Sequence, residues 1–196
     1  SPRCHLEDIT RADIYGYVVP FCLELMKLMK EYQIPIKIRA CDTMGYGVNY
    51  PGAVIPRSVQ GIIYALHTHA GVPHELLEWH GHNDFYKAVV NSSTAWLYGC
   101  SGVNTSLFGI GERTGNTPLE AMVFEYAQLR GTLNGMDTRV ITELAEYYEK
   151  EIGYHIPPRT PFVGKNFNVT RAGIHADGLL NFHVGSNLIK RHMSRS

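Results

Sequence analysis

The sequence predicts an α/β protein, specifically the C-terminal half of a TIM (β/α)8 barrel followed by an irregular lid segment. Short apolar strands and amphipathic helices alternate along the chain, which favours a parallel sheet with helices outside it. Polar residues follow several consecutive strands, as expected where a barrel builds its active site from the loops after its strands. A doubly wound sheet also fits the alternation, and the polar clusters favour the barrel. A complete barrel needs about 250 residues, so this chain of 196 residues should carry roughly half of one.

Hydrophobic periodicity predicts the first two elements. An apolar stripe over 14–28 indicates a helix, and Pro20 should kink it or move its start. Alternation over 34–41 indicates a strand, with Lys37 and Arg39 facing away from its apolar side.

The same cycle continues to Gly153. A helix is expected over 55–66, with Pro56 in its first turn. Further strands are predicted over 76–82 and 102–107, and further helices over 87–98, 118–130 and 137–152. We therefore assign 1–153 to the barrel, 154–180 to the lid and 181–196 to an unassigned tail. Because the chain opens at Ser1 without a methionine, we expect it to be part of a longer protein.

Composition excludes some classes of partner. The formal net charge of zero argues against nucleic acid, which usually requires a basic face. No apolar stretch approaches the roughly 18 residues of a membrane span, so no membrane partner is expected. The four cysteines are scattered and form no CxxC pair, which is typical of reduced thiols in a cytoplasmic protein.

The strongest motif is the run WHGHND, residues 79–84. Residues two apart on a strand point to the same side, so His80 and His82 can converge on one metal ion. Asn83 and Asp84 could supply the hydrogen bonds that fix the histidine tautomers. From spacing alone, a pair of structural histidines is about as probable.

Three more polar clusters lie where strands end. GIGERTGNTP, residues 109–118, joins a strand to a helix, and its glycines and helix start suit an anionic ligand. EDITRAD, residues 7–13, and CDTMGYG, residues 41–47, follow earlier strands. Each alone is more easily explained as a turn or cap. Four such clusters at consecutive strand ends predict a shared site.

These runs, together with RAGIHADG at 171–178, resemble the DRE-TIM metallolyases, in the branch that contains isopropylmalate, homocitrate and Re-specific citrate synthases. The loop after Cys41 and the run EWHGHNDFYK are most similar to the Re-specific citrate synthases. The resemblance implies a metal-dependent acyltransferase that condenses acetyl-CoA with a 2-oxo acid, oxaloacetate being favoured. It implies a divalent metal, with Mn²⁺ or Co²⁺ ahead of Zn²⁺ or Mg²⁺, and a homodimer with lid exchange.

The resemblance also implies roles for individual residues. The metal would be bound by His80, His82 and Asn116. The catalytic residues would be Glu7, Glu112 and His175, the last reaching into the partner subunit's site from the lid. Substrate would be bound by Thr43, Arg11 and Asn83.

One departure from the family leaves alternatives open. The family's first strand carries an Arg-Asp pair whose aspartate binds the metal, and nothing in these residues matches it. The alternatives are a homocitrate or 2-isopropylmalate synthase, a lyase of the same superfamily, and an inactive fragment or pseudoenzyme.

Overall fold

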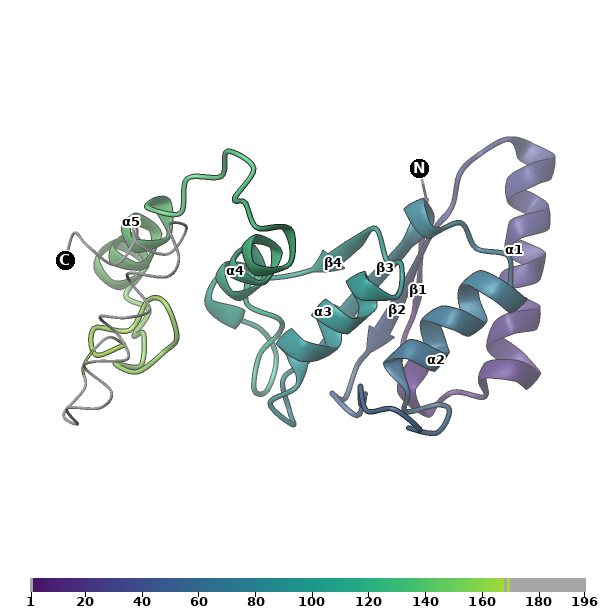
Figure 1. Ribbon diagram of the computed structural model, residues 1–196, viewed down its shortest axis with the longest axis horizontal. Coiled ribbons are helices and arrows are strands. Elements are labelled where there is room, and N and C mark those ends of the chain that lie inside the picture. Colours follow the sequence, from purple (N-terminus) through teal and green to yellow (C-terminus); the bar gives the residue numbers. More distant parts are fainter. Residues whose placement is uncertain (1, 168, 170–196) are drawn as a thin grey trace. The chain divides into compact units, whose positions relative to one another are not determined.

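The computed structural model describes residues 2–167 and 169 (Figure 1). By contact density the chain divides into two compact units, Ser1–Met122 and Val123–Ser196, and each is described by itself. The predicted divisions after 153 and 180 stay predictions.

The first unit is built on a parallel four-stranded sheet, which confirms the predicted α/β class. Its strands lie in the order β1-β2-β3-β4, which is also their order in the chain, and every neighbouring pair is parallel. They are β1 (Arg3–Leu6), β2 (Lys37–Asp42), β3 (Leu77–Gly81) and β4 (Gly102–Asn104). Sequential order with helical crossovers is the pattern of a barrel wall.

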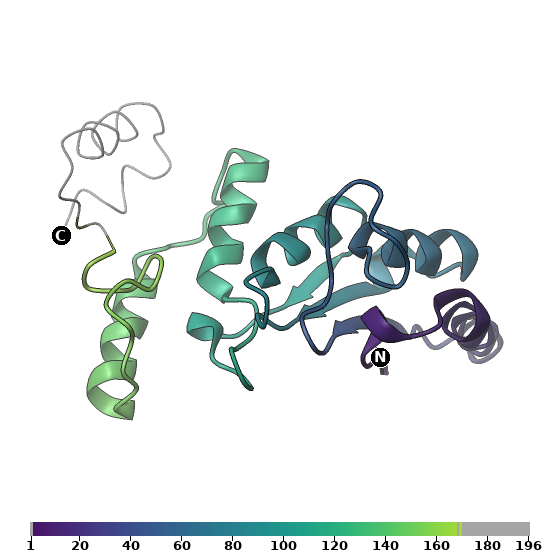
Figure 2. The same cartoon turned by 90° about the horizontal axis from the view of Figure 1, so that it is seen from below.

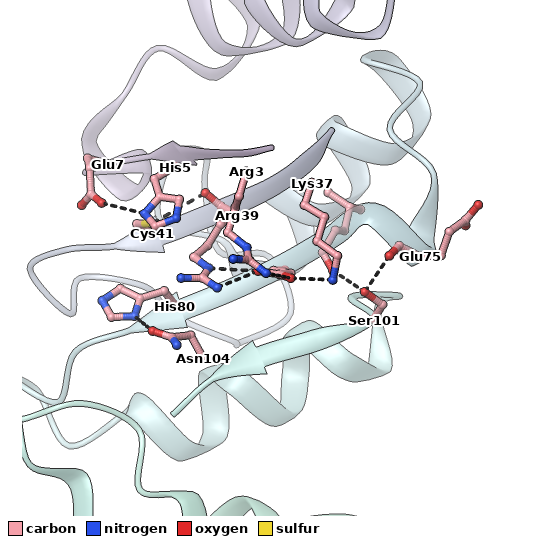
Figure 3. Close-up of polar contacts among 12 residues, drawn as sticks. Arg3, His5, Glu7, Lys37, Arg39, Cys41, Glu75, His80, Ser101 and Asn104 are labelled. Carbon is pink, nitrogen blue, oxygen red and sulfur yellow. Dashed lines mark hydrogen bonds and ion pairs between the residues drawn. The ribbon is translucent and has the colours of Figure 1, made fainter. Parts of the chain in front are cut away.

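One face of this sheet is apolar and packs under the helices. Ile38, Ala40, Leu77 and Trp79 are fully buried there, as the alternation over 34–41 predicts. The opposite face carries basic side chains of β1 and β2, among them Arg39, which Figure 3 shows gathered on one side. The alternation of side chains along the strands therefore separates an apolar face, which packs in the core, from a polar face that can carry functional residues.

The first helix begins later than its apolar stripe. Ile14–Val18 form a π-helical turn, and α1 (Val19–Tyr32) follows it. Pro20 lies in the first turn of α1, where its missing N–H is no loss. The prediction that Pro20 moves the helix start is confirmed.

The helix predicted over 55–66 also starts late, and the placement of Pro56 in its first turn is wrong. The segment α2 (Val59–Tyr64) is capped by Ser58, whose hydroxyl accepts the Gly61 N–H at 3.0 Å. A π-helical turn, Ala65–His69, continues it. The serine cap supplies the acceptor that an open N–H needs, so it decides where the helix begins.

Two further helices and three short turns account for the other elements of this unit. The helix α3 (Ala88–Leu97) lies beside α2, and α4 (Leu119–Arg130) begins in this unit (Figures 1 and 2). Short 3-10 turns occupy Ile9–Arg11, His74–Leu76 and Leu107–Gly109. The strand predicted over 102–107 ends early, at Asn104. Beyond it, the Ser106 N–H donates a backbone hydrogen bond to the Thr117 carbonyl at 3.1 Å.

The second unit holds the rest of α4 and α5 (Val140–Tyr147), which a π-helical turn, Tyr148–Ile152, extends to Gly153. Phe124 stacks on Phe162 with ring centroids 4.5 Å apart. Residues 154–167 form turns without a helix or strand, as expected of an irregular segment. None of the helices among the described residues has both the length and the hydropathy of a membrane span.

Candidate functional site

Polar side chains meet at the carboxyl edge of the sheet because the strand register aligns them. Cys41 on β2 pairs with His80 on β3, and His80 pairs with Asn104 on β4. Residues paired across parallel strands point to the same face. Figure 3 shows Cys41, His80 and Asn104 on this common polar face.

The two histidines of the WHGHND run converge, as their spacing predicts. His80 Nε2 and His82 Nε2 face each other at 3.1 Å, with the rings nearly perpendicular. His80 Nδ1 donates to Asn104 Oδ1 at 2.7 Å. That bond keeps the proton on Nδ1 and leaves the Nε2 lone pair for a ligand.

Electrostatics also favour a neutral imidazole at His80. Burial lowers the pKa of His80, and the nearby His82 lowers it further, whereas the hydrogen bond to Asn104 acts in the opposite sense. A metal ligand must carry an open nitrogen lone pair, so a lowered pKa suits ligation.

The loop that follows β4 pairs the backbone of Asn116 with that of His82. An isolated antiparallel bridge joins Asn116 to His82. Its Oδ1 atom is buried and has no hydrogen-bond partner, and the same is true of His82 Nδ1. Two imidazole nitrogens and a buried amide oxygen with an open lone pair form a donor set that fits a divalent transition metal.

A carboxylate that would complete this set is missing from the part of the chain that the structure describes. No Asp, Glu or Cys donor joins His80 and His82 as a third close ligand among residues 2–167 and 169. This agrees with the absence of the family's Arg-Asp pair from the sequence.

Glu7 and Thr43 lie together at the ends of β1 and β2. The Thr43 hydroxyl donates to Glu7 Oε2 at 2.8 Å and accepts the Asp8 N–H at 2.8 Å. Its only proton is therefore directed at Glu7, and binding a substrate carboxylate would require Thr43 to exchange partners. Arg11, also predicted to bind substrate, donates through Nε to both carboxylate oxygens of Asp8.

The loop after β4 is fastened to the loops after β2 and β3 by Arg113. Its guanidinium donates to both carboxylate oxygens of Asp84, at 2.8 and 3.1 Å, and to the Thr43 carbonyl at 2.6 Å. The hydrogen bond from Arg113 lowers the pKa of Asp84. Asp84 thus positions a loop and does not orient a histidine, so that prediction is wrong; Asn104 has the role.

The other predicted site residues make fewer side-chain contacts. The Glu112 side chain is exposed, and its carboxylate lies 3.7 Å from the Arg113 guanidinium. Asn83 accepts the Ala88 N–H at 3.4 Å. His175 lies outside the described residues.

Further from the strand ends, the carboxylate of Glu78 forms ion pairs with three basic side chains. Arg3, Lys37 and Arg39 all donate to Glu78, at 2.8 to 3.1 Å (Figure 3). Burial alone would raise the pKa of Glu78, but the three hydrogen-bond donors outweigh it and lower the pKa to about 2. This ion cluster bridges three strands and fixes the polar face beneath the histidines.

A second buried carboxylate supports the loop after β2. Asp42 accepts the Thr10 hydroxyl at 2.7 Å and the Gly47 N–H at 2.9 Å. Burial raises the pKa of Asp42, and these hydrogen bonds oppose that effect.

Sequence reasoning missed Asn104 and the Glu78 cluster. Asn104 lay within a predicted strand, and its partnership with His80 depends on register between strands. The sequence does indicate the position of Glu78, because it lies two residues before His80 on the same strand and must therefore point to the same face of the sheet.

The comparisons with known proteins identify the family of this chain. The HMGL-like family model matches residues 4–147. The chain is 71% identical over 179 residues to a citrate (Re)-synthase of Clostridium kluyveri, covering 91% of this chain and 40% of that protein. It is 62% identical to a citrate (Re)-synthase of Syntrophus aciditrophicus, over 91% of this chain and 28% of that protein. The chain thus spans well under half the length of both.

Among solved structures, the HMG-CoA lyase of Bacillus subtilis has a TM-score of 0.58 at 22% identity, covering 80% of this chain and 51% of that one. This likeness confirms the fold as part of a TIM barrel, whereas the assignment to the C-terminal half of the barrel is not confirmed. The predicted resemblance to the DRE-TIM metallolyases is also confirmed, and these are divalent-metal-dependent enzymes. Because the family model matches more than half of the chain, this chain belongs to the HMGL-like family.

Proposed function

We propose that the protein carrying this chain is a Re-specific citrate synthase, which condenses acetyl-CoA with oxaloacetate and hydrolyses the thioester. The observation that supports this most is the convergence of His80 Nε2 and His82 Nε2 at 3.1 Å, in a chain 71% identical to a citrate (Re)-synthase.

The metal ligands in this proposal are His80, His82 and Asn116. A bound divalent ion, Mn²⁺ or Co²⁺ by preference and Zn²⁺ or Mg²⁺ otherwise, supplies Lewis acidity at the keto group of the 2-oxo acid. Asn104 holds the His80 ring in place, and Arg113 holds the loop that carries Asn116.

The acid–base work is assigned to carboxylates and the lid histidine. In this proposal Glu7, whose carboxylate accepts the Thr43 hydroxyl, acts on the acetyl methyl group or the developing alkoxide. A base removes a proton from the methyl carbon, the carbanion attacks the keto carbon, and water then releases CoA. Glu112, Arg11 and Asn83 remain proposed contacts at the rim.

The lid, dimer and compartment belong to the same proposal. We infer that the enzyme is a cytoplasmic homodimer in which His175 from the lid of one subunit completes the site of the other. A mixture of His80→Ala and His175→Ala proteins should then regain activity on subunit exchange, because one site in each mixed dimer carries neither change. No recovery in proven heterodimers would exclude the crossed lid.

The experiment that tests the function is a substrate panel with isotope-labelled acetyl-CoA and Mn²⁺. We expect citrate from oxaloacetate, and the arm of citrate that carries the label shows which face of the carbonyl was attacked. Preferential use of 2-oxoglutarate or 2-oxoisovalerate would instead identify a homocitrate or 2-isopropylmalate synthase. No product from any 2-oxo acid with metal bound would favour a pseudoenzyme.

A further inference from the structure

A second set of metal-ligand side chains lies beside the histidine pair. His5 and Glu7 come from β1 and its end, two residues apart, and share the polar face of the sheet. Cys41 comes from the neighbouring strand β2. Figure 3 shows the three side chains close together at the end of the two strands.

The distances suit coordination of one ion. An imidazole nitrogen, a carboxylate oxygen and the thiol sulfur all lie within 4.8 Å of one another. His5 Nδ1 and Glu7 Oε1 are 3.9 Å apart. Zinc–ligand bonds of about 2.0 to 2.3 Å place tetrahedral donors roughly 3.5 Å apart, so small side-chain rotations bring these atoms into range.

The donors are free to bind without dismantling the proposed catalytic contact. Glu7 uses Oε2 to accept the Thr43 hydroxyl, which leaves Oε1 turned toward His5. The Cys41 thiol has a long contact with the Arg39 carbonyl, at 3.6 Å, and also hydrogen-bonds to Glu7, which is itself one of the proposed ligands. Arg39 itself is engaged by Glu78 and does not occupy the cluster.

The chemistry of the donors selects the kind of ion. A thiolate, an imidazole and a carboxylate are the three side-chain ligands of zinc, and a thiolate favours thiophilic ions over Mg²⁺ or Mn²⁺. On binding, the Cys41 S–H bond breaks, a sulfur–metal bond forms and the proton goes to solvent. Thiolate and carboxylate together then balance the charge of a divalent ion.

We propose that His5, Glu7 and Cys41 form a second metal site, separate from the His80–His82 pair, that takes a thiophilic divalent ion such as Zn²⁺. Three protein ligands leave the fourth position to water. The proposal rests on these contacts and not on the synthase function.

The test is titration with Co²⁺, which gives a near-ultraviolet charge-transfer band only when a thiolate is bound. His80→Ala/His82→Ala protein should still bind one equivalent of Co²⁺ with this band, and Zn²⁺ should displace it. Adding Cys41→Ser should abolish the band and weaken binding at least 10-fold. If the double variant does not fold, wild-type protein is first saturated with Mn²⁺ to fill the His80–His82 site, and Co²⁺ binding is then compared with and without Cys41→Ser.

The matched control is Cys4→Ser. Cys4 lies next to His5 on the same strand but packs against the apolar core, so this change should leave the band intact. A band that survives Cys41→Ser, or no band in any folded protein, overturns the proposal. A band present in wild type but lost in His80→Ala/His82→Ala would make Cys41 a ligand of the histidine site and also overturn it.

Discussion

The hydrogen bond from His80 Nδ1 to Asn104 Oδ1 decides at the scale of single residues how the histidine pair can act. It fixes the tautomer and the ring plane of His80, while His82 approaches from two residues further along the chain. Outer hydrogen bonds of this kind raise the affinity of metal ligands because they hold the lone pair in position.

Replacing Asn104 with Ala should weaken Mn²⁺ binding by roughly 10- to 100-fold, because His80 loses its acceptor. Isothermal titration measures the effect. Asn104→Asp keeps an oxygen acceptor and should restore most of the affinity. Equal affinity of Asn104→Ala and wild-type protein would show that the bond has no part in metal binding.

At the scale of elements, the site is assembled from loops that follow different strands. Arg113 connects the loop after β4 to Asp84 after β3 and to Thr43 after β2. A bidentate guanidinium–carboxylate pair fixes orientation as well as distance. The position of Asn116 therefore depends on a residue three positions earlier in the same loop.

Removing this connection with Arg113→Ala should speed amide hydrogen exchange across residues 108–117 and lower Mn²⁺ affinity roughly 10-fold. Arg113→Lys should recover only part of the loss, because an ammonium group cannot bond to both carboxylate oxygens in one plane.

The matched control is Arg139→Ala, since Arg139 also pairs with a carboxylate, Asp137, but does so at the surface of the second unit. Unaltered exchange in the 108–117 loop of Arg113→Ala would mean that other contacts hold it.

At the scale of the whole molecule, the Glu78 ion cluster links stability to pH. The pKa of Glu78 is lowered from 4.5 to about 2 in the folded protein. Its stabilising effect is therefore complete above pH 4.5, which is the unfolded value, and is lost as the pH falls toward 2. A shift of this size corresponds to at most about 3 kcal/mol of unfolding free energy.

Glu78→Gln should reduce the unfolding free energy at neutral pH and flatten its dependence on pH between 4.5 and 2. Arg3, Lys37 and Arg39 would then lack their common carboxylate. Urea unfolding at a series of pH values measures this. Glu24→Gln, which removes an exposed carboxylate paired with Lys27, should change neither the stability nor its pH dependence.

We also expect the 196-residue chain expressed by itself to form no citrate from acetyl-CoA and oxaloacetate. The described residues offer the histidine pair no carboxylate ligand. A coupled assay for released CoA, with saturating Mn²⁺, measures the rate. Turnover above the level of the His80→Ala/His82→Ala protein would show that the family's Arg-Asp pair is dispensable here.

The sequence by itself determined the alternation of strands and helices, the polar and apolar faces of β2, and the convergence of His80 and His82. All of these follow from periodicity within one segment, because side chains two apart on a strand must share a face. Local patterns also indicated that Pro20 shifts a helix start, but they placed the start of α2 too early, since the Ser58 cap outweighed the apolar stripe.

Only the tertiary structure decided which residue supports His80, what Asp84 binds, and that His5, Glu7 and Cys41 meet. Each of these depends on which strands are neighbours and on their register, as in the pairing of Cys41 with His80 and of His80 with Asn104. Spacing along the chain does not specify such pairings, because the partners come from segments tens of residues apart that meet only when the sheet forms. Asp84 illustrates the limit: next to the histidines in sequence, it turns instead to Arg113, which supplies the stronger, charged partner.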